Sequence, residues 1–313
     1  PDRLMDTVAR VTSHLQLKLA GHPDASRRSL VLIPARSGES YHRDPDGNWW
    51  RVYLFIAGAR THDVIRSPEQ AYQAARAFGE FQRQLVDLPG VRLHETIPNF
   101  HNTPSRFADF ERALAADARN RAREAKAEIE FVLARRSLAD ALLRRHAAGE
   151  LPERITHNDT KINNVMLDDA NGEGICVIDL DTVMPGLAMY DFGDLVRTST
   201  SPAAEDETDL SKVRFQMPMY QALLEGYLAS AAGFLTPAEK AALALGGKLI
   251  TLEIGVRFLA DFLAGDIYFK IKRPHHNLDR CRTQFALVAD IERHEPEMQA
   301  ALARIDAAIP PQN

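Results

Sequence analysis

Two short polar segments hold the residues best suited to chemistry. Residues 157–164 read HNDTKINN, and Asp179 follows an apolar run fifteen residues after Asn164. Phosphoryl transfer is catalysed mainly by positioning and by neutralising charge, so a carboxylate, an amine and an amide close together suit it. The two segments therefore predict a phosphotransferase site.

Each residue type has a predicted role. Asp159 is the candidate base, because a carboxylate can orient a hydroxyl and accept its proton. Lys161 lies two residues later and can stabilise the transferring phosphate as a point charge. Asn164 and Asp179 supply the hard oxygen ligands that Mg²⁺ prefers.

The order H-x-D-x-K-x-x-N is typical of the catalytic loop of protein kinases and their relatives. The alternative is a polar turn before a strand, but four polar positions and the later Asp179 would then coincide by chance. Asp191-Phe192-Gly193 imitates the kinase metal-binding triplet without an apolar strand before it. We interpret Asp191 and Asp194 as residues that cap or support the loop through backbone hydrogen bonds.

Composition limits the classes of function. The 313 residues are 45% hydrophobic with a net charge of −5, which predicts one large domain or a two-lobed unit and disfavours nucleic acid as the main partner. Cys176 and Cys281 lack metal-binding spacing. Without a long apolar run or a signal pattern, we predict a cytoplasmic protein that does not bind membranes.

Periodicity predicts the elements before the loop. Residues 2–19 form an amphipathic helix, and residues 29–36 and 48–57 form a hairpin around the turn at 44–47. Ser67 and Pro68 begin a helix that ends near residue 86. A long helical region is predicted over residues 105–149.

The second half is predicted to be a hairpin followed by helices. The hairpin strands are 163–167 and 174–180, and the helices are 210–232, 237–265 and 279–305, after an acidic, flexible connector at 201–209. Hydrogen-bond donors concentrate near Gly265 and Pro274 and could together wall a polar pocket. They are Arg257, Tyr268, Lys270, Lys272, Arg273, Arg280 and Arg282.

Residues 156–165, 178–186 and 190–194 resemble the aminoglycoside phosphotransferase and choline kinase-like family, and within it the N-acetylhexosamine 1-kinase group. Similar segments at 100–103, 268–271 and 276–280 extend the likeness over most of the chain. The resemblance implies an α+β, bilobal, protein-kinase-like fold with a large, mainly helical C-terminal lobe.

The resemblance also implies a reaction and its partners. The enzyme would transfer the γ-phosphate of ATP, with Mg²⁺, to the anomeric hydroxyl of N-acetylglucosamine or N-acetylgalactosamine. Asp159 would be the base, while Thr182, Arg257 and Tyr268 would contact the sugar. Adenine would bind beside Tyr53, Leu54, Phe55 and Ile56.

The sequence departs from the family at its start. The glycine-rich hairpin and strand lysine that precede the first helix in family members are missing, and that helix offers only Asp2 and Asp6 as acids. We therefore expect residues 1–57 to be a partial N-terminal nucleotide-binding lobe, truncated upstream, and residues 58–313 to be the C-terminal catalytic and sugar-binding lobe. Weak ATP binding and low activity are expected.

Two alternatives remain. One is a kinase for another small alcohol: an aminoglycoside, choline or a different hexose. The other is a catalytically impaired fragment that binds ATP or sugar. The sequence does not decide the sugar or the oligomeric state.

Overall fold

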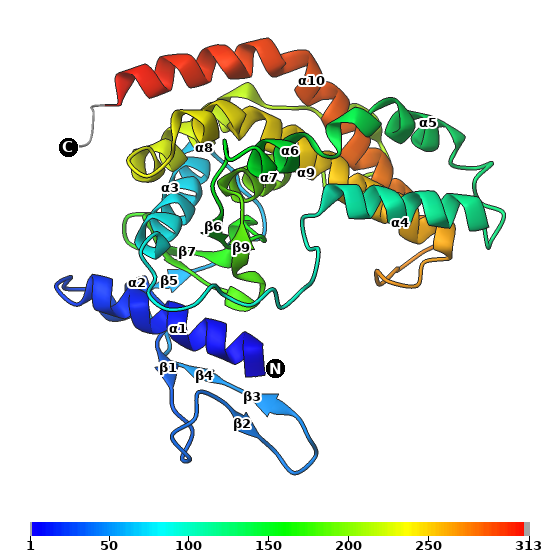
Figure 1. Cartoon of the computed structure of the whole chain (residues 1–313). Helices are drawn as coiled ribbons and strands as arrows, with labels where there is room; N and C mark the ends of the chain where they lie inside the picture. Colours follow the sequence, from blue (N-terminus) through cyan, green and yellow to red (C-terminus); the bar gives the residue numbers. More distant parts are fainter. Residues whose placement is uncertain (1, 310–313) are drawn as a thin grey trace.

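The computed structural model describes residues 2–309 and has an α+β fold (Figure 1). At one end of the molecule, α1 (Asp2–Leu19) and α2 (Ala25–Arg28) lie near two small antiparallel ladders. In these, β1 (Leu32–Ile33) pairs with β4 (Val52–Tyr53), and β2 (His42–Arg43) pairs with β3 (Trp49–Trp50). The predicted N-terminal hairpin is confirmed, but each of its ladders joins only two residues per strand.

The first helices form as their patterns predict. The apolar residues Val8, Val11 and Leu15 of α1 are buried. In α3 (Pro68–Leu85), the Ser67 side chain accepts a hydrogen bond from the backbone N–H of Gln70. Burial of one apolar stripe on each helix, rather than helix propensity alone, stabilises such amphipathic helices.

Two further sheets frame the catalytic segments. β5 (Ala59–Arg60), β7 (Val165–Asp168) and β8 (Gly174–Val177) form an antiparallel sheet in the order β5-β7-β8, and β6 (Arg154–Thr156) pairs with β9 (Met184–Gly186). The predicted second hairpin is confirmed. It ends before the predicted residue 180, because Asp179 adopts a left-handed backbone conformation with φ of 60°.

The continuous helical region predicted over residues 105–149 is interrupted. It forms α4 (Thr103–Ala116), α5 (Lys126–Ala134) and α6 (Ala141–Ala147). Asp117 ends α4 with φ of 34°, and its carboxylate accepts backbone hydrogen bonds from Arg121 and Ala122. Asp competes for backbone donors in this way at turns. Single 3₁₀ turns occur at Arg136–Leu138, Ile162–Asn164, Leu180–Thr182 and Leu210–Lys212.

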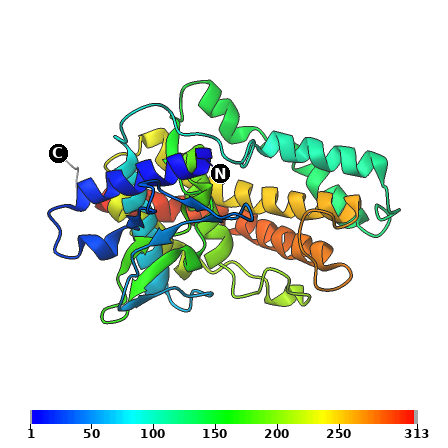
Figure 2. The same cartoon turned by 90° about the horizontal axis from the view of Figure 1, so that it is seen from below.

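Four helices complete the fold: α7 (Ala188–Ser199), α8 (Met217–Ala231), α9 (Pro237–Ala264) and α10 (His276–Ala308). Thr236 and Glu239 form a capping box at the start of α9. Figure 2 shows α4, α9 and α10 extending side by side away from the sheets. The predicted helix at 210–232 starts only at Met217. Within residues 2–309, no helix combines the length and apolar character needed to cross a membrane.

Glycines bring α7 and α9 unusually close together. A Cβ atom added to Gly193 of α7 would lie 2.5 Å from the backbone oxygen of Gly246 in α9. A Cβ added to Gly246 would lie 2.5 Å from the backbone oxygen of Met189. The two helices therefore pack at a separation that no larger residue at these positions would permit.

Candidate active site

The catalytic loop connects β6 to β7. Asn158, just before Asp159, has φ of 66°, and such a left-handed conformation in a residue other than glycine persists only where the surroundings enforce it. The Asn158 side chain donates to the carbonyl of Thr182 at 2.8 Å and accepts from the Thr156 hydroxyl at 2.9 Å. The ring of His157 contacts the carbonyl of Ile178 at 2.9 Å through Nε2. The loop is thus tied directly to the segment that carries Asp179.

Asp191 on α7 holds the backbone of the loop. Its Oδ1 accepts the N–H of Asn158 at 2.7 Å, and its Oδ2 accepts the N–H of His157 at 2.8 Å and the Gln82 amide at 2.6 Å. Complete burial raises the pKa of Asp191, although His157 and these hydrogen bonds oppose the shift. The two oxygens of Asp191 thus accept three hydrogen bonds, which offset the cost of burying this side chain.

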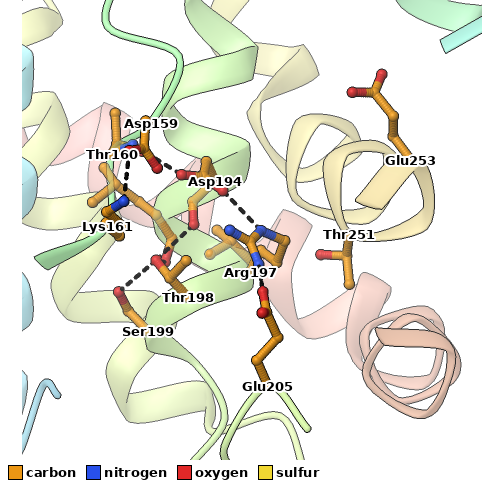
Figure 3. Close-up of polar contacts among 12 residues, drawn as sticks. Asp159, Thr160, Lys161, Asp194, Arg197, Thr198, Ser199, Glu205, Thr251 and Glu253 are labelled. Carbon is orange, nitrogen blue, oxygen red and sulfur yellow. Dashed lines mark hydrogen bonds and ion pairs between the residues drawn. The ribbon is translucent and has the colours of Figure 1, made fainter. Parts of the chain in front are cut away.

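Asp194, one helical turn further along α7, holds the next part of the loop (Figure 3). Its Oδ2 accepts the N–H of Thr160 at 2.8 Å, and its Oδ1 accepts the Nε–H of Arg197 at 2.8 Å. Arg197 also pairs with Glu205 at 3.2 Å. The predicted support role of Asp191 and Asp194 is confirmed by these hydrogen bonds.

Asp159 and Lys161, the predicted base and phosphate-binding residue, lie side by side in the loop. Lys161 Nζ lies 2.8 Å from Asp159 Oδ2, which also accepts from Asn164 Nδ2 at 2.9 Å (Figure 3). Burial acts to lower the pKa of Lys161, but Asp159 outweighs it and the pKa is raised. Lys161 is therefore a cation at neutral pH. Within residues 2–309, no hydrogen bond reaches Asp159 Oδ1, so this oxygen can accept a proton from an incoming hydroxyl.

Asn164 and Asp179 fit the predicted metal-binding role in donor chemistry. Asn164 uses its Nδ2 to hold Asp159, which leaves its Oδ1 as an uncommitted acceptor within the described chain. Asp179 is exposed at the end of β8. Residues 2–309 contain no group of three or more His, Cys, Asp or Glu side chains arranged to hold a metal. Two protein ligands suit Mg²⁺, which keeps several waters and binds substrate phosphates.

The predicted adenine segment lies at the end of β4. The Tyr53 side chain is half-buried near Asp179 and Asp181, and burial raises its pKa. Leu54 is 44% exposed and Phe55 is 86% exposed, whereas Ile56 belongs to the buried core. Leu54 and Phe55 thus present apolar surface to a ligand, whereas the buried Ile56 can only support that surface from the core.

A cavity of about 450 Å³ lies between α4 and α9, and Arg257 and Tyr268 both line it. The Arg257 guanidinium lies 5.7 Å from the ring of Phe100 and 5.6 Å from that of Phe269. Burial lowers the pKa of Arg257, although Glu253 opposes the shift. No carboxylate in residues 2–309 lies within ion-pair distance of this guanidinium. The sequence-predicted residues Arg257 and Tyr268 are therefore brought together in one cavity.

The third predicted sugar contact lies elsewhere. Neither Thr182 nor Asp159 lines this cavity. The hydroxyl of Thr182 is buried without a hydrogen-bond partner in the described chain, while its carbonyl anchors Asn158. An unpaired buried hydroxyl is costly, so Thr182 is suited to a polar ligand beside the catalytic loop.

The donor-rich segment near Gly265 does not form one wall, contrary to expectation. Of its members, only Arg257 and Tyr268 line the cavity. Arg273 and Arg280 instead pair with Asp206 and Glu205 of the acidic connector. These ion pairs also tie down the connector, which the sequence predicted to be flexible.

Sequence reasoning missed three supporting contacts. They are Arg51 with Asp181 at 2.5 Å, the Tyr227 hydroxyl with Gln82, and His101 with Glu253 at 2.9 Å. Glu253 offered a signal: it is the only charged residue between Lys248 and Arg257. A lone acid in an apolar run is buried only with a partner.

Comparison with known proteins identifies the family and the fold. Residues 25–236 match the model of the phosphotransferase enzyme family. The fold is similar to an aminoglycoside phosphotransferase from Alicyclobacillus acidocaldarius, with a TM-score of 0.57, 15% identity and 96% of this chain and 84% of that one covered.

Two other solved structures share the fold. A choline/ethanolamine kinase family protein from Mesorhizobium loti has a TM-score of 0.53 at 19% identity, covering 98% of this chain and 85% of that one. A microcompartment-associated aminopropanol kinase also has a TM-score of 0.53, at 16% identity, covering 94% and 82%. By its family match, the chain belongs to the phosphotransferase enzyme family.

Proposed function

We propose that the chain transfers the γ-phosphate of ATP to the anomeric hydroxyl of an N-acetylhexosamine, giving the sugar 1-phosphate. The observation that carries the proposal is the guanidinium of Arg257, which lines the cavity between α4 and α9 without a carboxylate partner in the described chain. The N-acetylhexosamine itself is suggested by the resemblance of the loop segments.

The charges around the cavity favour an uncharged acceptor. Asp261 is saturated, since its carboxylate accepts the N–H groups of Ile267, Tyr268 and Phe269 and the amide of Asn277. The other acid, Asp109, lies beside Arg106 and Arg112. Neither acid is therefore free to pair with an ammonium group, while Arg257 has no carboxylate partner in the described chain. Like charges brought together across an interface are unfavourable, which disfavours the ammonium groups of choline, ethanolamine, aminopropanol and aminoglycosides.

Each site residue is given a role that suits the polar group it presents to a ligand. Asp159 Oδ1 would accept the proton of the sugar hydroxyl, while Lys161 would neutralise charge on the transferring phosphate. Asn164 and Asp179 would hold Mg²⁺, which when bound neutralises charge on the nucleotide phosphates. Thr182, Arg257 and Tyr268 would contact the sugar by hydrogen bonds and stacking.

The nucleotide would lie across the N-terminal segment. Tyr53, Leu54, Phe55 and Ile56 would border adenine, with the exposed ring of Phe55 as the main contact surface. In this proposal, residues 1–57 are the nucleotide-binding lobe and residues 58–313 the catalytic and sugar-binding lobe. β5 begins directly after this boundary and pairs with β7 of the catalytic sheet.

The test is ATP consumption with Mg²⁺ across a panel of acceptors. It contains N-acetylglucosamine, N-acetylgalactosamine, glucose, galactose, choline and an aminoglycoside. Glucosamine is the matched control for charge, because it replaces the neutral acetamide of N-acetylglucosamine with an ammonium group. The methyl glycoside of N-acetylglucosamine is the control for the reacting hydroxyl, because its anomeric oxygen is blocked.

We expect turnover with at least one N-acetylhexosamine, about tenfold or more above glucosamine, which corresponds to about 1.4 kcal/mol. The methyl glycoside should not react. Preferred turnover of choline or of the aminoglycoside would instead establish a kinase for a cationic alcohol. ATP consumption with the methyl glycoside would contradict transfer to the anomeric hydroxyl.

A further inference from the structure

His101 is buried between an acid and the catalytic loop. It is 7% exposed, and it lies just before α4. Its Nδ1 lies 2.9 Å from Oε1 of Glu253, which is fully buried on α9. Its Nε2 lies 3.3 Å from the carbonyl oxygen of Asn158. One imidazole therefore connects α9 to the residue that precedes the proposed base.

Both contacts need a proton on the histidine. A carboxylate and a backbone carbonyl are acceptors only, whereas a neutral imidazole has one N–H donor and one lone pair. A neutral His101 would therefore place a ring lone pair against an oxygen lone pair at one of the two contacts. The arrangement is satisfied only when both ring nitrogens of His101 carry protons.

Glu253 is held as the matching anion. Burial acts to raise the pKa of Glu253, but His101, the Thr103 hydroxyl and Arg257 outweigh it, so the pKa lies below its usual value. The Thr103 hydroxyl donates to Glu253 Oε2 at 2.6 Å. Glu253 thus has a charged or polar partner on each carboxylate oxygen, as a buried charge requires.

Other titratable groups face this pair from the neighbouring elements. The ring of Tyr190 on α7 lies 5.1 Å from that of His101, and burial raises its pKa, so it is neutral. Arg257 lies one turn beyond Glu253 on α9, and Arg106 of α4 donates to the carbonyl of Phe100. A cavity of about 150 Å³ beside His101 is also lined by Glu95, His146 and Glu153.

The contact from His101 completes the restraint on Asn158. The N–H of Asn158 is held by Asp191 and its side chain by Thr156 and Thr182. The carbonyl is bound by His101 alone among the described residues. A strained residue persists only when its surroundings over-determine it, and the next residue in the chain is Asp159.

We propose that His101 is held as an imidazolium by Glu253 and acts as a positioning residue, fixing the carbonyl of Asn158 and thereby the orientation of Asp159. The part that concerns Asp159 as base rests on the proposed function. The protonation state of His101 does not depend on that function and can be measured by itself.

The direct test is a ¹⁵N NMR spectrum of the full chain labelled at histidine ring nitrogens, recorded at neutral pH. The His101 signals are assigned by their loss in His101→Gln. We expect both ring nitrogens of His101 to show the shift of a protonated nitrogen. A signal from one unprotonated ring nitrogen would overturn the proposal, whether or not the chain turns over any substrate.

The kinetic test compares His101→Gln with His146→Gln. His146 is the matched control, because it lines the same small cavity but contacts the carbonyl of Leu151 instead of the loop. We expect His101→Gln to lower kcat by about tenfold to 100-fold, as expected for a misplaced reacting group, with little change in KM for ATP or sugar. His146→Gln should keep wild-type kcat.

The remaining outcomes separate the two proposals. Equal kcat in both variants, with only a lower melting temperature for His101→Gln, would reduce His101 to a structural residue. If the wild-type chain shows no turnover on the acceptor panel, the proposed function fails, and the NMR result still decides the state of His101. Glu253→Gln provides a second check: one ring nitrogen of His101 should then lose its proton.

Discussion

The catalytic loop and the acceptor cavity differ in how their polar groups are used. In the loop, Asp191 and Asp194 saturate the backbone donors of His157, Asn158 and Thr160. The cavity instead presents Arg257 without a carboxylate partner in the described chain. Preorganised groups suit a reaction that depends on positioning, whereas free groups suit recognition of a ligand. Under the proposed function, the comparison teaches that the reaction would depend on the preorganised loop and substrate choice on the cavity.

The largest effect is expected at Asp159, whose Oδ1 has no hydrogen-bond partner within residues 2–309. Asp159→Asn should lower kcat about 1000-fold, because it removes the proton acceptor without changing volume. ADP release and thermal unfolding measure the two consequences, and the melting temperature should barely change. Asp169→Asn, at the exposed turn after β7, is the control and should retain activity. Unchanged turnover in Asp159→Asn would remove Asp159 from the role of base.

The second prediction concerns Asp179, a proposed Mg²⁺ ligand that is exposed in the structure. Asp179→Ala should raise the Mg²⁺ concentration for half-maximal rate by about tenfold to 100-fold, as loss of a group that supports a metal does. A Mg²⁺ titration of the rate at saturating ATP measures this. An unaltered requirement would point to Asp181 as the ligand instead.

The third prediction concerns Asp191, which accepts the backbone N–H groups of His157 and Asn158 in the loop. Asp191→Ala leaves the N–H groups of His157 and Asn158 buried without their acceptor, which should lower the free energy of unfolding by about 3 kcal/mol. Urea denaturation measures that loss, and kcat should fall with it. If stability fell while kcat stayed at the wild-type value, the loop would not need this restraint for catalysis.

The smallest effect is expected in the cavity. Arg257→Met keeps an unbranched stem between Phe100 and Phe269 but removes the charge, and it should raise KM for the sugar about tenfold. The KM for ATP should stay constant, as should both values in the exposed control Arg112→Met. A fall in the KM for glucosamine would sharpen the comparison further, because it would show that charge repulsion had excluded the amine.

The loop could be predicted from sequence because its chemistry is local. Asp159, Lys161 and Asn164 lie within six residues of one another, and the structure brings their side chains together. Their roles stay predictions. The support from Asp191 and Asp194 was also predictable, since both lie soon after the second hairpin. Amphipathic periodicity likewise predicted α1, α3 and the long α9.

Contacts between distant segments could not be predicted in the same way. His101 and Glu253 are 152 residues apart, and only the fold brings them together. Arg273 and Arg280 likewise pair with the acidic connector. For this reason they do not line the cavity, although the sequence predicted that they could. The end of α4 at Asp117 depended on one side chain that competes for backbone donors, which outweighed the helical composition around it.

The close packing of α7 on α9 through Gly193 and Gly246 has a consequence for motion. α7 carries the aspartates that hold the catalytic loop, and α9 carries Glu253 and Arg257. Two helices in backbone contact cannot slide past each other without a steric clash. The loop of the proposed base and the helix that carries Arg257 are therefore expected to move as one unit, and under the proposed function closure around bound substrates would fall to other parts of the molecule.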